Sequence, residues 1–474
     1  MGEWRRWMPR RIGQASWLLV LLAAMSASAD NRAGSTSSAT PPNIVIFFAD
    51  DLGYGDLGSF GHPYIRTPNI DNLAANGQRW TDFYVAAPVC SPSRAALLTG
   101  RLPVRSGLYG NTIRVYFPDE PGGLPQSEVT LAEALRDSGY ATGMFGKWHL
   151  GDAPHALPTR HGFDEWLGIP YSNDMNREKL PIMLDEKVIE IKPDQSLLTK
   201  RYTDFAIDFI NSKNDDEPFF VYLAHSMPHV PIFASDNFKG TSMGSVYGDV
   251  IEEIDHNVGR LVSVLKEKNI YDNTIIIYTS DNGPWLTYGN HAGSSGPLRG
   301  GKFDVFEGGY RVPCVISWPD VIPANTKVDQ LVSAIDILPT ICAATGANLP
   351  KNKIDGVNVL ELLKNKPQPE LEDRFFYYHK NNTLFGVRQG KWKYLAPSTF
   401  SYIETPGEDA KSGKGIWAVE HEESLYNLDT DLREYDNRLE DFPDKVDELK
   451  EKLAEFQLEL DSEARPLGTF NNIN

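Results

Sequence analysis

The sequence predicts an α/β protein: a large, mostly parallel mixed sheet between layers of helices, followed by a smaller C-terminal subdomain of antiparallel strands and a helix. Short apolar runs alternate with helical segments through residues 43–369, which is typical of a parallel sheet. The composition changes near residue 370, where strand-like segments precede a charged amphipathic segment. The chain has 474 residues, of which 41% are hydrophobic and 23% charged, so it can bury a core of this size.

The first 42 residues are expected to precede the folded domain. Four arginines among residues 5–11 form a positive segment, residues 17–25 are apolar, and Ala27-Ser28-Ala29 fits the small-residue cleavage rule. We therefore expect a signal peptide over residues 1–29, export to the periplasm or the exterior, and a disordered leader over residues 30–42. The alternative is a membrane anchor, but the apolar run is far shorter than the ~20 residues that a spanning helix needs. No later segment is long and apolar enough, so we expect no stable membrane insertion.

Apolar runs and helix signals place the main elements. The strand candidates in the large domain are residues 44–48, 141–145, 219–223 and 275–278. The helix candidates are residues 68–76, 93–99, 131–138, 202–212 and 248–268, the first with Thr67 as its N-cap. In the C-terminal subdomain, residues 370–474, we expect strands at 375–378, 384–388 and 392–395, a surface loop at 398–417 and a helix at 445–460.

Three cysteines are too few for a disulfide framework. Cys314 lies in a strand-like run and Cys342 in a helix-like run, so we expect both to be buried thiols, with a bridge between them as the alternative. Cys90 is then left over in an exported chain, which calls for an explanation of its own.

Polar side chains follow each of the four strand candidates. These residues are Asp50 and Asp51 after the first, Lys147 and His149 after the second, His229 after the third, and Asp281 and Asn282 after the fourth. Ligands bind beyond the carboxyl ends of the strands in open α/β sheets, so we expect these side chains to converge. Three carboxylates and an amide oxygen suit a hard cation such as Ca²⁺, whereas zinc prefers His and Cys ligands. The alternative is that each aspartate merely caps a turn or a helix.

Cys90 lies just before the predicted helix at 93–99, where backbone N–H groups favour an anion. Arg94 is expected about one turn into that helix, on the same side as Cys90. Two interpretations remain from these residues alone: a thiolate nucleophile, or a buried cysteine that fills space.

Several motifs resemble those of one family. Cys90-Ser91-Pro92-Ser93-Arg94 resembles the C-x-P-S-R signature of type I, formylglycine-dependent sulfatases, which belong to the alkaline phosphatase superfamily, and residues 146–151 resemble the second signature of that family. Residues 43–55, 228–231, 280–283, 299–302 and 307–309 resemble further family blocks in the same order. The resemblance covers residues 42–345 and is closest to arylsulfatases and N-acetylgalactosamine sulfatases.

The resemblance implies a site and a mechanism. It implies that a maturation enzyme oxidises Cys90 to formylglycine, whose hydrate attacks sulfur, and that Ca²⁺ is held by Asp50, Asp51, Asp281 and Asn282 beside residue 90. Asp281 would act as the base, His149 would take a proton when sulfate is expelled, and His229, helped by Lys302, would protonate the leaving alcohol. Arg94, Lys147, His149 and Lys302 would surround the sulfate oxygens.

The identity of the leaving group is predicted from weaker features of the sequence. Tyr171, Asn173 and Asp174 resemble a segment near the pocket mouth of related sulfatases, Trp285 and His291 could contact a sugar, and Arg160 could meet a second anionic group. These features favour a sulfated galactose or galactosamine in a carbohydrate. Aryl or lipid sulfates, a phosphonate or phosphodiester hydrolase, and a non-catalytic glycan-binding protein are the alternatives. A net charge of -18 argues against a nucleic-acid partner, and nothing in the sequence sets an oligomeric state.

Overall fold

The computed structural model describes residues 40–109, 115–214 and 216–466. The expected signal peptide and residues 30–39 of the expected leader lie outside this range. Described residues from 41 onward belong to one compact unit. The boundary proposed near residue 370 therefore remains a prediction about subdomains within that unit.

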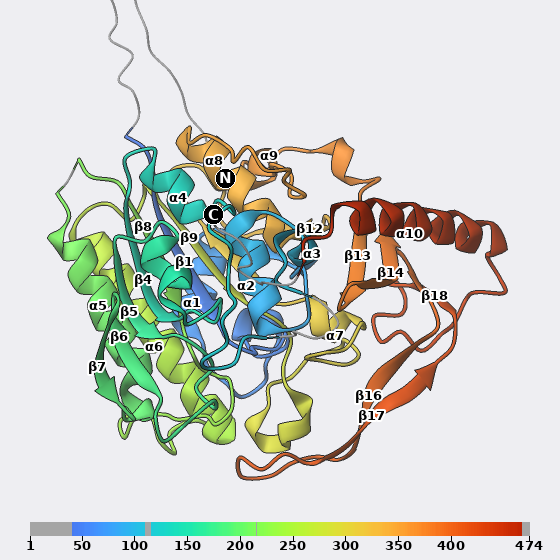
Figure 1. Ribbon diagram of the computed structural model, residues 1–474, viewed down its shortest axis with the longest axis horizontal. Helices are drawn as coiled ribbons and strands as arrows, with labels where there is room; N and C mark the ends of the chain where they lie inside the picture. The colour runs from blue at the N-terminus through green and yellow to red at the C-terminus, as the bar shows by residue number, and fades with distance from the viewer. Residues whose placement is uncertain (1–39, 110–114, 215, 467–474) are drawn as a thin grey trace, which may run out of the picture. The chain divides into compact units, whose positions relative to one another are not determined.

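A ten-stranded sheet forms the centre of the larger part of the chain (Figure 1). Its strands lie in the order β11-β2-β10-β9-β1-β8-β4-β5-β6-β7, and neighbours among β9, β1, β8 and β4 pair in parallel. The strands are β1 (Asn43–Ala49), β2 (Gln78–Trp80), β4 (Ala141–Lys147), β5 (Glu165–Ile169), β6 (Pro181–Leu184), β7 (Lys187–Ile191), β8 (Phe219–Ala224), β9 (Thr274–Ser280), β10 (Cys314–Ser317) and β11 (Thr326–Val328). A separate pair joins β3 (Phe83–Tyr84) to β12 (Val332–Ser333). The four predicted strands are therefore neighbours in one sheet.

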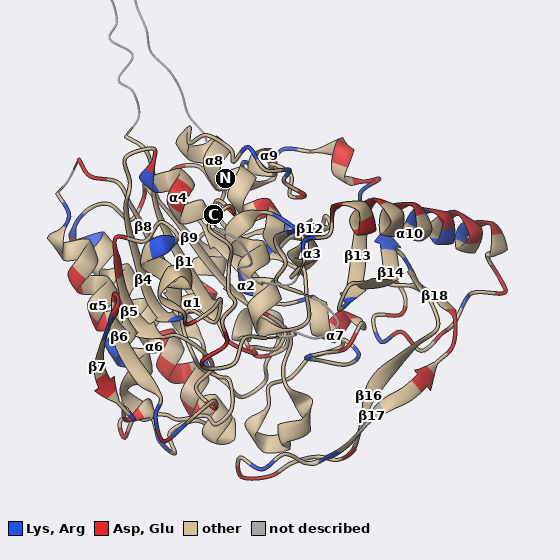
Figure 2. Ribbon diagram, viewed as in Figure 1, with Lys and Arg blue, Asp and Glu red and all other residues tan. Residues whose placement is uncertain are grey.

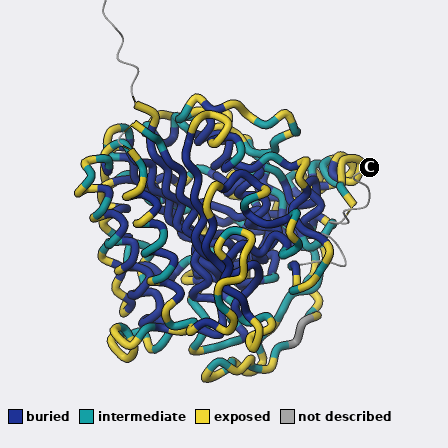
Figure 3. Tube along the Cα trace, turned by 60° about the vertical axis from the view of Figure 1, so that its left-hand side comes forward, coloured by how far each residue is buried: buried dark blue, intermediate teal, exposed yellow. Residues whose placement is uncertain are grey.

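Helices cover both faces of this sheet, as predicted. In β1, Ile44 and Ile46 pack toward α2, α4 and α8, whereas Val45 and Phe47 pack toward α1, α5 and α6. A strand buried on both faces has a continuous apolar sequence, which explains the uninterrupted run in β1. Figure 3 shows this buried interior in dark blue. The helices are α1 (Pro68–Ala75), α2 (Cys90–Thr99), α3 (Pro103–Ser106), α4 (Leu131–Arg136), α5 (Leu198–Ser212), α6 (Ser245–Glu267), α7 (Glu307–Tyr310), α8 (Ile337–Thr345) and α9 (Leu360–Leu363).

Helix α2 starts earlier than the sequence predicted. Cys90 is its first residue rather than a residue before it, and Pro92 lies inside the first turn. Proline is tolerated there because the N–H groups of a first turn have no acceptor within the helix. Gly100 ends the helix in the left-handed conformation (φ 67°), as the sequence suggested. The correction places residue 90 on a rigid element instead of in a loop.

The C-terminal residues form a four-stranded antiparallel sheet, a hairpin and a helix. The sheet has the order β13 (Phe375–Lys380), β14 (Thr383–Gln389), β15 (Trp392–Leu395), β18 (Ser424–Asn427), and α10 (Pro443–Glu463) packs on it. The predicted surface loop at 398–417 is wrong, because β16 (Ser398–Thr405) and β17 (Lys414–His421) pair there as a hairpin. Two of the three glycines in this segment, Gly407 and Gly413, lie in the turn between these strands.

A buried charge network joins the C-terminal sheet to α7. Glu307 accepts a hydrogen bond from the Tyr378 hydroxyl (2.6 Å) and pairs with Lys393 Nζ (3.0 Å), which also pairs with Glu434 (2.7 Å). Burial alone would raise the pKa of Glu307, but Lys393 and two arginines lower it to about 2. The network thus keeps Glu307 ionised although it is removed from water, whereas burial raises the pKa of the second carboxylate, Glu434, to about 7.

Three further findings concern the sequence predictions. Cys314 and Cys342 are buried free thiols, as expected, which excludes a bridge between them. Within the described ranges, no helix has both the length and the apolar character that crossing a bilayer requires. Figure 2 shows acidic residues on many elements, with residues of both charges along α10.

Candidate active site

The carboxyl ends of the central strands bring the predicted polar residues together. Asp50 and Asp51 follow β1, and Asp281 and Asn282 follow β9, its neighbour in the sheet. The Asp51 N–H donates to Asp281 Oδ1 (3.0 Å), and Asn282 Nδ2 donates to Asp51 Oδ1 (2.6 Å). All four side chains are buried. The parallel pairing of β1 and β9 therefore assembles the acidic group.

Three cations neutralise the three carboxylates. Lys147 Nζ, at the end of β4, lies 2.5 Å from Asp50 Oδ2, and Lys302 Nζ lies 2.8 Å from Asp51 Oδ1. Arg94 on α2 reaches Asp281 Oδ2 through Nη2 at 2.7 Å. Burial alone would raise the pKa of Asp50, but Lys147 and the other cations hold it well below its usual range.

Asp281 differs from Asp50. Burial and the charge of Asp50 raise the pKa of Asp281 to about 7, against the opposing effect of Arg94. Burial alone would lower the pKa of Lys302, but Asp51 raises it above its usual value, so Lys302 stays protonated. Asp281 is consequently the carboxylate of this site that takes up a proton most readily.

Cys90 faces this group from the first turn of α2. Its Sγ lies 3.6 Å from Asp50 Oδ1, and burial raises the pKa of the thiol far above its usual value. An unmodified thiol would stay protonated, so it is a poor nucleophile at neutral pH. Residue 90 therefore has the position of a reactive group, but an unmodified cysteine thiol does not have the reactivity.

The site has the chemistry of a hard-cation site. Ligand atoms of Asp50, Asp51, Cys90 and His229 all lie within 4.8 Å of one another. Asn282 Oδ1 is buried and has no hydrogen-bond partner among the described residues, so an oxygen donor is left unsatisfied beside the carboxylates. The oxygens of Asp50, Asp51, Asp281 and Asn282 suit Ca²⁺ or Mg²⁺, whereas Cys90 and His229 offer the donor types that zinc prefers.

Two histidines flank the acidic group with defined tautomers. His149 Nε2 donates to the Tyr116 carbonyl (3.0 Å), which leaves the buried Nδ1 without a partner among the described residues. His229 Nδ1 donates to the Val230 carbonyl (2.6 Å), and its Nε2 lies 3.7 Å from Asp51 Oδ2. Burial, followed by nearby lysines, lowers the pKa of both rings.

Ser172 belongs to the site and was missed as a site residue. Its Oγ lies 3.3 Å from Lys147 Nζ and 3.4 Å from His229 Nε2. It follows β5, the strand next to β4, which was not among the predicted strands, so the rule that found the other residues was not applied there. Asn173, which the sequence favoured instead, donates through Nδ2 to Pro231 O (3.0 Å) and to Gln195 Oε1 (3.0 Å). Asn173 thus braces the segment that carries His229.

The predicted rim residues fall into two groups. The Trp285 ring lies 5.6 Å from the His229 ring and 4.6 Å from Lys302 Nζ, so it forms a wall of the site. Tyr171 is buried, which raises its pKa to about 12. Asp174 is half-buried, and its Oδ1 has no hydrogen-bond partner in the described part of the chain.

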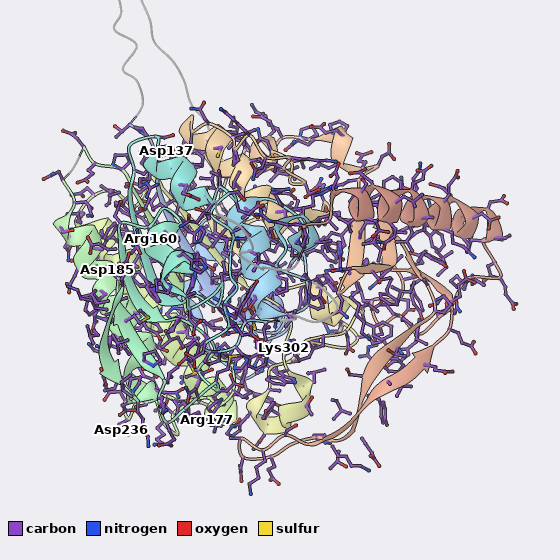
Figure 4. All side chains as sticks on the ribbon, viewed as in Figure 1. Asp137, Arg160, Arg177, Asp185, Asp236 and Lys302 are labelled. Atoms are coloured by element: carbon purple, nitrogen blue, oxygen red, sulfur yellow. The ribbon has the colours of Figure 1, made fainter. Side chains whose placement is uncertain are left out.

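Two other predicted rim residues interact with groups outside the cluster. Arg160 pairs with Glu186 (2.8 Å) and is half-exposed, and Figure 4 shows it well apart from Lys302. His291 lies in the 3-10 helix η5 (Leu286–His291) and interacts electrostatically with Asp409 of the C-terminal hairpin turn. The structure therefore does not bring Arg160 to the site, because its guanidinium is engaged by a carboxylate on the hairpin between β6 and β7.

Comparison with known proteins places the chain in one class. The family model described as Sulfatase matches residues 42–347, and the chain belongs to this family, whose members are sulfuric ester hydrolases. A second family model, N-sulphoglucosamine sulphohydrolase, C-terminal, matches residues 301–401.

Individual relatives match most of the chain. Arylsulfatase A of Bos taurus is 39% identical over 92% of this chain and 88% of its own length. N-acetylgalactosamine-6-sulfatase of Sus scrofa is 42% identical over 79% of this chain and 74% of its own length. The crystal structure of Ps i-CgsB in complex with k-i-k-neocarrahexaose superposes with a TM-score of 0.76 at 29% identity, covering 91% of this chain and 95% of that one.

Proposed function

We propose that this sulfatase removes sulfate from a sulfated carbohydrate of the galactose or galactosamine type. The observation that carries the proposal is the buried group of Asp50, Asp51, Asp281 and Asn282, which meets residue 90 at one edge of the sheet. The names of the matched relatives support the substrate class, since one is a galactosamine sulfatase and another was solved with an oligosaccharide.

Ca²⁺ is the metal that we propose for this group. Asp50, Asp51, Asp281 and Asn282 would hold it, with Asn282 Oδ1 supplying the neutral ligand. When bound, the ion supplies positive charge beside residue 90 and to one sulfate oxygen. Arg94, Lys147 and Lys302 are already ordered by ion pairs with the carboxylates, so they need little rearrangement to surround the other sulfate oxygens.

We propose that Cys90 acts after conversion to formylglycine by a separate maturation enzyme. The hydrated aldehyde supplies two hydroxyls, one to attack sulfur and one whose deprotonation expels sulfate. The high pKa of the unmodified thiol supports this proposal, since the thiolate is disfavoured at residue 90. Asp281, whose pKa is raised, would take the proton of the attacking hydroxyl.

The two histidines have different parts in this scheme. His149 presents an unprotonated Nδ1 in its neutral form, so it can accept the proton of the second hydroxyl. His229 donates its Nδ1 proton to Val230 O, so it can protonate the leaving alcohol through Nε2 only when the ring carries both protons. Lys302, held beside it by Asp51, is the adjacent permanent cation.

Export through the predicted signal peptide completes the proposal, because a polymeric substrate lies outside the cell. The maturation enzyme would then have to act on the chain before or during export.

The nucleophile is tested by Cys90→Ala, with Cys342→Ala as the control, since Cys342 is a buried free cysteine on α8. We expect Cys90→Ala to abolish hydrolysis of 4-nitrophenyl sulfate with an unchanged melting temperature, and Cys342→Ala to retain it. Peptide mass spectrometry of active protein should show formylglycine at residue 90. Residual sulfatase activity in Cys90→Ala, or an unmodified thiol in fully active protein, would contradict the assignment.

The substrate is tested on a panel. Released sulfate is measured with defined sulfated galactose and galactosamine oligosaccharides, a steroid sulfate, 4-nitrophenyl sulfate and 4-nitrophenyl phenylphosphonate. We expect the oligosaccharides to give the highest kcat/KM. Faster turnover of the steroid sulfate or the phosphonate would favour the lipid sulfatase or the phosphonate hydrolase instead.

A further inference from the structure

A cavity of about 330 Å³ is lined by Trp285, by the loop that carries Lys302 and by the C-terminal hairpin. We call it the hairpin cavity; its lining includes Trp285, Arg299, Lys302, Phe400, Tyr402 and Tyr435. Its volume is in the range of sites for small ligands, roughly 300–1,000 Å³. None of the predicted roles uses the hairpin or Tyr435.

Arg299 is an unusual cation in this cavity. Its guanidinium carbon lies 3.8 Å from the centroid of the Phe306 ring, 5.1 Å from that of Tyr435 and 5.2 Å from that of Phe400. Nη1 donates to the Glu434 carbonyl (2.7 Å), and among the described residues no carboxylate pairs with Arg299. A guanidinium has five N–H donors, so aromatic rings hold in place a cation that can still bind an anion.

The hairpin is fixed over the cavity by backbone contacts. The N–H groups of Gly407 and Gly413, in the turn between β16 and β17, both donate to the Thr287 carbonyl in η5 (2.9 and 2.8 Å). Figure 1 shows the hairpin extending away from the rest of the C-terminal sheet. The cavity wall is therefore tied to the segment that directly follows Trp285.

The cavity also adjoins the acidic group of Asp50, Asp51 and Asp281. Lys302 lines the cavity while its Nζ bonds Asp51, and Trp285 lines it while its ring contacts His229. Two tyrosines that line the cavity remain exposed, Tyr402 at 52% and Tyr435 at 72%. Exposed aromatic rings around a cavity are typical of binding surfaces, and their faces suit the C–H faces of a sugar ring.

We propose that the hairpin cavity binds an anionic sugar residue of the same oligosaccharide, next to the sugar that loses its sulfate. Arg299 pairs with the sulfate or carboxylate of that residue, and Tyr402 and Tyr435 stack on its ring. The inference rests on the proposed function, because it assigns the part of a carbohydrate substrate beyond the reacting sugar. A substrate without a neighbouring sugar, such as 4-nitrophenyl sulfate, does not use the cavity.

The test compares long and short substrates in three variants: Tyr402→Ala, Tyr435→Ala and Arg299→Met, the last of which keeps the packing on Phe306 and removes the charge. The long substrate is a chondroitin 6-sulfate hexasaccharide. Tyr64→Ala is the matched control, since Tyr64 is also exposed and does not line the cavity. We expect each cavity variant to raise KM for the hexasaccharide about tenfold, as loss of one good binding contact does. The kcat/KM for 4-nitrophenyl sulfate should stay within about twofold.

Binding is measured separately from turnover by calorimetry on Cys90→Ala protein. The sulfated hexasaccharide should bind about tenfold more weakly to Cys90→Ala combined with Arg299→Met. Chemically desulfated hexasaccharide, which keeps its carboxylates, shows which anion Arg299 recognises. Unchanged hexasaccharide affinity in the cavity variants, an equal loss on both substrates, or no binding of the hexasaccharide would overturn the proposal. Failure of the wild-type protein to hydrolyse any sulfate ester would instead contradict the proposed function and would leave the calorimetry as the test of the cavity.

Discussion

Calcium binding should depend on pH through Asp281. Burial and the charge of Asp50 raise the pKa of Asp281 to about 7, while that of Asp50 stays far below its usual range. A metal ion binds the ionised carboxylate, so protons compete with calcium below the pKa. The raised pKa therefore means that calcium affinity approaches its full value at about pH 8 and is lost as the pH falls through 7.

The size of the effect follows from the ionised fraction. With a pKa of about 7, roughly nine-tenths of Asp281 is ionised at pH 8 and roughly one-tenth at pH 6. We therefore expect the calcium Kd to rise about tenfold between pH 8 and pH 6, a cost of ~1.4 kcal/mol, and about tenfold again by pH 5. About one proton should be released per calcium bound at pH 6.

Isothermal titration calorimetry on Cys90→Ala protein measures both quantities, because this variant cannot turn over and two buffers of different ionisation enthalpy report the released proton. Asp281→Asn in the same background is the control: it should bind calcium more weakly and with a flatter pH dependence. A Kd that changes less than threefold between pH 8 and pH 6, or an unchanged slope in Asp281→Asn, would refute the reasoning.

Four further outcomes follow from individual contacts. His229→Gln should reduce kcat on a sugar sulfate by ~10² or more and much less on 4-nitrophenyl sulfate, whose leaving group needs no proton; equal losses would argue against His229 as the acid. Because the pKa of His229 is lowered below 6.5, kcat for the sugar sulfate should fall as the pH rises through that lowered pKa, and a profile that rises there would contradict the role. Asn173→Ala removes the hydrogen bond to Pro231 O, so kcat should fall, while the free energy of unfolding should drop by only about 1 kcal/mol per lost bond. An unchanged kcat would show that the activity does not depend on this hydrogen bond. Lys393→Met leaves Glu307 and Glu434 without their shared cation, so we expect the free energy of unfolding in urea at pH 7 to fall by ~3–5 kcal/mol. An unchanged free energy of unfolding would show that the network does not stabilise the fold.

The parts of the site that the sequence predicted are those that strand geometry determines. Asp50, Asp281 and Lys147 each lie within three residues of the end of an apolar run, and parallel pairing brings such positions to one edge. The start of α2 was misplaced because Pro92 looks like a helix boundary, although the first turn tolerates proline. The strand rule therefore located its residues correctly, whereas the helix prediction erred only in the residue at which the first turn of α2 begins.

Contacts between distant segments could not be read in the same way. Arg160 was a candidate for contact with a second anionic group of the substrate, whereas the fold brings Glu186 to 2.8 Å from it. Residues 398–417 looked like a loop because the glycines of the hairpin turn were averaged with its strands. Ser172 was passed over for Asn173, its neighbour, since only the fold shows which of the two faces Lys147.

The charges of the site suit the divalent ion that we propose. Three buried carboxylates face Arg94, Lys147 and Lys302, so these six groups balance to zero when all are ionised. A sulfate monoester adds one negative charge in a water-excluded volume, and burying that charge without compensation costs several kcal/mol. Transfer of the proton of the attacking hydroxyl to Asp281 leaves the total charge unchanged, but it moves negative charge from the carboxylate to the attacking oxygen. A Ca²⁺ held by Asp50, Asp51, Asp281 and Asn282 would supply positive charge both to the bound sulfate and to that oxygen as its charge develops.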